Sequence, residues 1–160
     1  MTSTLSVPSR LRHTSQMECP LPDLAATIAL AARIAAIMQP GDAILLEGPL
    51  GAGKTEFTRA LLRAATATPG LEVPSPTFTL VQSYDTPRGT VHHFDLWRLT
   101  GPAGLIELGW DDARDDIVLV EWPDRLGHLA PDRALTILFV PGPNESRVAH
   151  VNGWLDRLSE

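Results

Sequence analysis

The chain has 160 residues, of which 44% are hydrophobic and 20% charged, and these fractions are typical of a soluble globular protein. Its 13 lysines and arginines against 19 aspartates and glutamates give a formal net charge of −6, which argues against binding a nucleic-acid backbone by charge alone. The single cysteine excludes an internal disulfide and a cysteine-rich zinc site, and no apolar run reaches the roughly 20 residues of a membrane span. We therefore expect neither a membrane nor DNA as a partner.

The N-terminal segment differs in composition from the rest of the chain. Residues 1–17 hold four serines, three threonines and two arginines but no acid, and they lack the apolar segment of a secretory signal. We expect residues 1–20 to form a disordered tail. A transit peptide is the alternative, because such peptides are also rich in arginine and serine.

The next segment predicts a helix, a strand and a second helix. Apolar residues recur every three or four positions over 24–38, which predicts an amphipathic helix with Asp23 as its N-cap. The short apolar run 43–46 predicts a strand buried on both faces. A glycine-rich turn follows, and a second helix is expected over about 53–65.

The second half of the chain favours short strands. Residues 79–84 and 91–95 predict a hairpin around Pro87-Arg88-Gly89, and 117–120 predict another buried strand that ends at Glu121. Helical turns are expected over 102–115, a last hairpin over 133–140 and 147–152, and a short helix over 154–158. The sum is an α/β fold, with a mixed, mostly parallel sheet flanked by helices on both sides.

Residues 48–55 (GPLGAGKT) match the phosphate-binding pattern G-x-x-x-x-G-K-S/T between a predicted strand and a predicted helix. Glycines let backbone N–H groups converge on phosphate oxygens, and the positive end of the following helix favours the anion. Lys54 is expected at the β- and γ-phosphates of ATP, and the Thr55 hydroxyl on Mg²⁺. A plain glycine-rich turn is the alternative. The candidate nucleotide-binding residues are Gly48, Leu50, Gly51, Ala52, Gly53, Lys54, Thr55 and Glu56.

Two acids at predicted strand ends could complete such a site. Glu121 directly follows a buried strand and is the candidate acid for holding Mg²⁺ or its water. Asp95 ends the strand of the hairpin and could orient the attacking water. A solvent-facing carboxylate is the alternative for Glu121, and a turn-forming aspartate is the alternative for Asp95.

Two further features are less specific. Ser75-Pro76-Thr77 could form a switch that senses the γ-phosphate, although the residues alone favour a proline-rich connector. His92 and His93 are adjacent in a predicted strand, so their side chains should point to opposite faces and cannot bind one metal together.

Five stretches taken together resemble the TsaE family, also called YjeE, of small bacterial ATPases required to make threonylcarbamoyladenosine in tRNA. The resemblance covers about residues 21–150. The P-loop alone is generic, whereas the SPTF, HFDLWR and EWP motifs together are specific. The stretches are GPLGAGKTEFTRALL (48–62), SPTFTLVQSY (75–84), HFDLWRL (93–99), ELGWDD (107–112) and VEWPDRLG (120–127).

The resemblance implies a role for each matching residue. Lys54 and Thr55 keep their P-loop roles toward ATP and Mg²⁺, and Glu121 of the EWP motif is the magnesium-associated acid. Asp95 of the HFDLWR motif is the catalytically required acid, so the candidate catalytic residues are Lys54, Asp95 and Glu121. Trp122 lies close to the nucleotide. Residues 21–160 are then one P-loop ATPase domain.

Some positions depart from the family pattern. Trp97 stands where the family usually has tyrosine, and Pro49 where it usually has aspartate or asparagine. Arg147 is the nearest match to an arginine that often precedes the last strand, and it is a further candidate for nucleotide binding. The resemblance also implies a cytoplasmic protein that acts with TsaB and TsaD and meets tRNA only through that complex.

Two other functions remain open at this stage. A small P-loop kinase would need an acceptor pocket and usually an arginine-rich lid, which the stretch after Glu121 does not indicate. A nucleotide-gated assembly subunit would bind ATP without depending on its hydrolysis. No arginine stands out as an arginine finger, so a partner could supply one.

Overall fold

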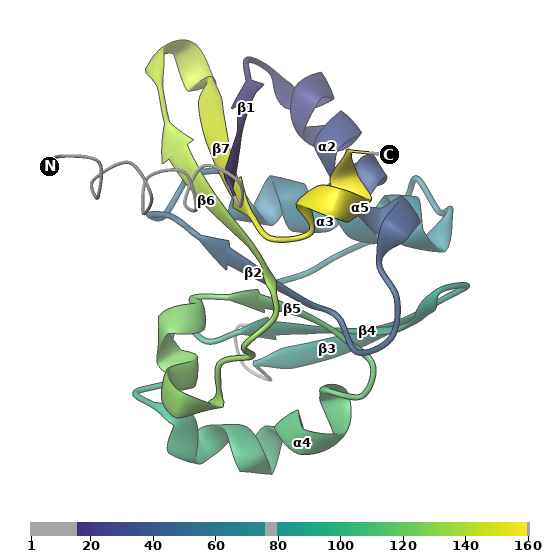
Figure 1. Ribbon diagram of the computed structural model, residues 1–160, viewed down its shortest axis with the longest axis vertical. Helices are drawn as coiled ribbons and strands as arrows, with labels where there is room; N and C mark the ends of the chain where they lie inside the picture. The colour runs from purple at the N-terminus through teal and green to yellow at the C-terminus, as the bar shows by residue number, and fades with distance from the viewer. Residues whose placement is uncertain (1–15, 76–79, 160) are drawn as a thin grey trace, which may run out of the picture.

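A computed structural model describes residues 16–75 and 80–159 of the protein (Figure 1). Its strands form one seven-stranded sheet with the order β1-β7-β6-β2-β5-β4-β3. The strands are β1 (Gln16–Leu21), β2 (Ala43–Glu47), β3 (Val81–Thr86), β4 (Gly89–Asp95), β5 (Ile117–Glu121), β6 (Leu135–Pro141) and β7 (Arg147–Asn152).

The centre of the sheet is parallel and its two edges are antiparallel. β2 pairs in parallel with both β5 and β6, and β4 pairs in parallel with β5. β3 returns antiparallel to β4 as the predicted hairpin, while β7 lies antiparallel between β6 and β1. The predicted mixed sheet is therefore confirmed, with its parallel part limited to the four central strands.

Helices cover both faces of the sheet (Figure 1). The helices α2 (Leu24–Ile37) and α3 (Lys54–Thr66) pack with the short helix α5 (Leu155–Leu158) on one face. The other face is covered by α4 (Trp110–Ala113) and by two 3₁₀ helices, η2 (Pro102–Leu108) and η3 (Pro123–Leu129). A third 3₁₀ turn, η4 (Pro143–Glu145), joins β6 to β7.

The sheet separates two hydrophobic cores, because successive side chains of a strand point to opposite faces. In β2, Ile44 and Leu46 pack toward α2 and α3, whereas Ala43 and Leu45 pack toward α4. Trp110 is 2% exposed and forms an edge-to-face pair with Phe94 in the second core. The continuous apolar runs of the central strands follow from this two-sided burial.

The start of the folded region differs from the prediction. Residues 16–20 were expected in the tail, but Gln16–Leu21 forms β1, paired residue for residue with β7. An edge strand depends on backbone hydrogen bonds to its neighbour, so it needs no strong apolar pattern of its own. Residues 1–15, 76–79 and 160 lie outside the described residues, and the switch expected at Ser75-Pro76-Thr77 falls mainly among them.

Within residues 16–75 and 80–159, no helix has the length and apolar character that crossing a bilayer requires.

The N-cap of α2 provides a test of this local structure. The Asp23 carboxylate accepts a hydrogen bond from the Ala26 N–H at 3.0 Å. We expect Asp23→Ala to lower the free energy of unfolding by about 1 kcal/mol, because it leaves that helix N–H without its side-chain acceptor. Thermal unfolding should show a melting temperature lower by about 2–4 °C. Asp23→Asn keeps an acceptor and should stay close to wild type; equal melting temperatures for Asp23→Ala and wild type would contradict the cap.

Candidate functional site: a phosphate-binding loop beside two strand-end acids

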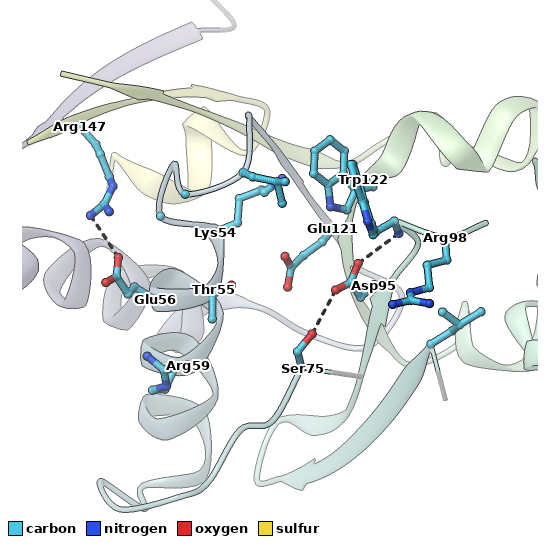
Figure 2. A pocket seen from close by; sticks show the side chains of 15 residues that line it. Lys54, Thr55, Glu56, Arg59, Ser75, Asp95, Arg98, Glu121, Trp122 and Arg147 are labelled. Carbon is cyan, nitrogen blue, oxygen red and sulfur yellow. Dashed lines mark hydrogen bonds and ion pairs between the residues drawn. The ribbon is translucent and has the colours of Figure 1, made fainter. Parts of the chain in front are cut away.

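A cavity of about 440 Å³ lies where β2, β4 and β5 end (Figure 2). The loop after β2 leads into α3 along one side of the cavity, and the ends of β4 and β5 form the other side. Parallel strands place their carboxyl ends at the same edge, which is where α/β sheets bind ligands. The cavity therefore lies where the strand order predicts a ligand site.

The loop has a shape that only glycine allows at two positions. Gly48 has a φ of +138°, and a Cβ there would lie 2.7 Å from the carbonyl oxygen of Phe139. Gly53 has a φ of +113°, and its Cβ would lie 2.7 Å from Cδ of Arg147. Gly53 is also the N-cap of α3 and caps it with no side chain. The free N–H groups of that first turn suit an anion.

Lys54 is the first residue of α3 and is only 4% exposed. Its Nζ donates a hydrogen bond to the carbonyl oxygen of Gly48 at 2.6 Å and lies 3.5 Å from the centroid of the Trp122 ring. Burial lowers the pKa of Lys54, and the opposing attraction of Glu121 and Asp95 is the weaker effect. The ammonium thus sits in a poorly solvated position, where an incoming anion would compensate its charge.

The two acids predicted at strand ends are direct neighbours. Asp95 ends β4 and Glu121 ends β5, and the two residues stand opposite each other in the parallel register. Glu121 is 6% exposed, and its Oε2 lies 2.8 Å from Nε2 of His93. Asp95 accepts hydrogen bonds from the Ser75 hydroxyl at 3.3 Å and from the Trp97 N–H at 3.2 Å. Figure 2 shows both carboxylates between the loop and the end of the sheet.

Two tryptophans form one wall of the cavity. The rings of Trp97 and Trp122 have centroids 4.5 Å apart. Trp122 adopts a left-handed backbone conformation with a φ of +60°, which an aromatic residue seldom adopts. Trp97 is 45% exposed, so part of this wall faces solvent.

Arg147 reaches the loop from β7, which lies on the other side of β2 from β5 and β4. It begins β7, and its guanidinium lies 3.1 Å from the Glu56 carboxylate in the first turn of α3. Its side chain also occupies the space that a Cβ at Gly53 would need. Because both residues line the cavity, this ion pair forms the rim on the α3 side (Figure 2).

The structure brings together most of the residues that the sequence predicted. Gly48 and Ala52 do not line the cavity. The Gly48 carbonyl accepts the hydrogen bond from Lys54, and Ala52 is fully buried in the core beneath the loop. The predicted residues that do line it are Leu50, Gly51, Gly53, Lys54, Thr55, Glu56, Asp95, Glu121, Trp122 and Arg147.

Two arginines were not anticipated. Arg59 and Arg98 both line the cavity, and neither forms an ion pair with another residue of the described ranges. Arg59 lies one helical turn after Thr55, a spacing that could have identified it. The position of Arg98 depends on the loop after β4, which no periodic pattern predicts.

Oxygen donors of this kind fit magnesium. Mg²⁺ in proteins is typically held by one or two carboxylates, substrate phosphates and water. Thr55 and Glu121 offer a hydroxyl and a carboxylate on facing sides of the cavity (Figure 2). The described residues contain no cluster of three or more histidines, cysteines or acids suited to a metal, so a preformed all-protein cage is absent from them.

Residues 21–149 match the family model of the threonylcarbamoyl adenosine biosynthesis protein TsaE. The chain belongs to the TsaE family. This confirms the resemblance drawn from the motifs and, with it, the predicted role in threonylcarbamoyl adenosine biosynthesis.

Individual relatives agree with the family. The tRNA threonylcarbamoyladenosine biosynthesis protein TsaE of Nostoc sp. PCC 7120 is 33% identical over 145 residues, which cover 88% of each chain. The TsaE of Synechocystis sp. PCC 6803 is 40% identical over 120 residues, covering 72% of this chain and 75% of the relative. The TsaE of Rickettsia felis is 40% identical over 101 residues, but the match spans only 58% of that protein.

A solved structure supports the fold. The crystal structure of Bacillus subtilis YdiB superposes with a TM-score of 0.71 at 26% identity, over 90% of this chain and 89% of that one. This likeness extends over most of both chains, so it confirms the predicted α/β fold of P-loop type.

The lowered pKa of Lys54 predicts a pH dependence of stability. Between the folded pKa and the ordinary value of 10.5, the unfolded chain binds more protons than the folded protein, so the free energy of unfolding rises with pH there. Below that window both states are protonated, and the folded state bears the full cost of the buried ammonium. We expect the stability of wild type relative to Lys54→Met to increase as the pH rises toward 10.5, measured by urea unfolding without nucleotide. A difference that stays constant over this range would contradict the burial of the charge.

Proposed function

We propose that the protein is a magnesium-dependent ATPase that serves tRNA threonylcarbamoylation. The observation that carries this proposal is the meeting of Lys54 and Thr55 with the carboxylates of Asp95 and Glu121 around one cavity. A P-loop supplies binding for phosphates, and strand-end acids supply what hydrolysis needs beyond binding. The proposed cofactors are ATP and Mg²⁺.

The chain's own groups have distinct tasks in this proposal. Backbone N–H groups at the start of α3 bind phosphate oxygens, and Lys54 exchanges its contacts with Gly48 and Trp122 for the β- and γ-phosphates. Thr55 and Glu121 would hold Mg²⁺, which neutralises charge that develops on the phosphates. Glu121 is suited to this task because its buried position limits the water that competes for its oxygens.

Asp95 is the residue we assign to the attacking water. Its carboxylate lies directly beside Glu121 in the register and faces the cavity (Figure 2). The hydrogen bonds from Ser75 and from the Trp97 backbone fix its orientation. A carboxylate oriented in this way can accept a hydrogen bond from water and align it with the γ-phosphate.

We further propose that the ATPase acts in the cytoplasm with TsaB and TsaD, and that tRNA is reached through that complex. Two exposed apolar side chains at the cavity rim, Leu50 at 70% and Trp97 at 45%, support a protein partner that covers the site. The net charge of −6 is consistent with recognition of proteins in preference to the tRNA backbone.

Substitutions at Lys54 and Asp95 test the catalytic assignment. We expect Lys54→Ala to lower both ATP affinity and hydrolysis, by about 100-fold or more in rate, because a charge on the transferring phosphate is lost. Asp95→Asn should keep ATP affinity and lower the rate by about 100-fold, because the water loses its acceptor. Steady-state phosphate release and equilibrium binding of ATP separate the two effects. Asp111→Asn, an exposed acid outside the cavity, is the control, and full hydrolysis by both site variants would refute the assignment.

The role of the partners has its own test. Phosphate release is measured for the purified chain alone and after addition of TsaB and TsaD. We expect a slow rate alone that rises with both partners, because covering the cavity excludes water from the phosphates. If the rate does not change when the partners are added, and labelled phosphate passes from ATP to an acceptor other than water, the kinase alternative would be favoured.

A further inference from the structure

His93 is a buried titratable residue that the proposed reaction does not use directly. It lies on β4 two residues before Asp95 and is 2% exposed. Its Nε2 lies 2.8 Å from Oε2 of Glu121, while its backbone stands opposite Leu119 on β5. The imidazole therefore reaches across the strand pair to the carboxylate at the end of β5.

The ring makes a single hydrogen bond in the described part of the chain. Its Nδ1 is buried without a hydrogen-bond partner among those residues, so its contact with Glu121 is its only polar connection there. A carboxylate oxygen accepts, so Nε2 is the donor and carries the hydrogen. Loss of that bond would leave both ring nitrogens buried without a partner among those residues, and each buried unsatisfied polar group destabilises the protein.

That bond limits how Glu121 can move. A glutamate side chain has three rotatable bonds, but here Oε2 is fixed by His93 and the Glu121 carbonyl accepts the Leu96 N–H at 3.1 Å. Oε1 has no protein partner among the described residues, and the carboxylate points into the cavity (Figure 2). One oxygen is thus held by the protein and the other is presented to the ligand.

We propose that His93 is the positioning residue of the cation site: it holds one oxygen of Glu121 so that the other meets Mg²⁺ opposite Thr55. This inference rests on the proposed function, in which Glu121 holds the cation. Groups that hydrogen-bond a metal-binding side chain typically change metal affinity by about 10–100-fold when removed.

A pair of amide substitutions isolates the hydrogen bond. His93→Gln keeps an N–H donor that can reach Glu121, whereas His93→Asn is one bond shorter and cannot. Both place an amide in the same buried position, so they share its desolvation cost and differ in reach. His92→Asn is the matched control, because His92 makes an equally short bond of 2.8 Å, to Asp116, on the opposite face of β4.

The readout is binding and does not depend on turnover. Mn²⁺ is titrated into the full chain with ADP and followed by electron paramagnetic resonance, and ADP affinity is measured separately in EDTA. We expect His93→Asn to weaken Mn²⁺ binding by about 10–100-fold and His93→Gln to stay within about threefold of wild type. His92→Asn should match wild type, and ADP affinity in EDTA should be the same in all four proteins.

Other results would overturn the inference. Wild-type Mn²⁺ affinity in His93→Asn, or equal losses in His93→Asn and His93→Gln, would mean that this hydrogen bond does not set the cation site. A loss of ADP affinity in EDTA that parallels the loss of Mn²⁺ would give His93 a purely structural role. Glu121→Gln distinguishes a failure of the His93 inference from a failure of the proposed function on which it rests. If Glu121→Gln also leaves Mn²⁺ binding unchanged, the proposed role of Glu121 fails as well as that of His93.

Discussion

The parallel pairing of β2, β5 and β4 is the constraint on which the site depends. It aligns Leu46 with Glu121 and Glu121 with Asp95, so the loop after β2 and the two acids reach the same edge of the sheet. A slip of one residue would turn every apolar side chain of a strand to the opposite face. The two buried cores therefore fix the register, and the register fixes how far the loop after β2 lies from Asp95 and Glu121.

The site concentrates charge in a place that water hardly reaches. Lys54, Glu121 and His93 are all less than 7% exposed, and each is held by a specific polar contact. Burial of this kind costs stability unless partners are present. The surrounding apolar core offsets this cost. Burial leaves Lys54 and Glu121 poorly solvated, so a phosphate and a cation can compensate their charges. The stable sheet thus supports a destabilised site.

Much of this could be predicted from sequence because the relevant information is local. The spacing of apolar residues gave α2 and the buried strands, and the motif GPLGAGKT gave the loop with Lys54 and Thr55. The acids Asp95 and Glu121 could be chosen because each directly follows a strand. Other features had no such signal: β1 is held by pairing to β7, and Arg98 enters the cavity from an irregular loop.

By itself, the sequence determined the family, the order of the elements and the residue types that handle phosphate, because turn chemistry and periodicity act over a few neighbouring residues. Only the tertiary structure decided which of the two adjacent histidines meets Glu121, and that Lys54 rests between Gly48 and Trp122. Those contacts join residues as many as 68 positions apart. They depend on strand order and register. Both follow from packing of the whole sheet, so no short stretch of sequence predicts them.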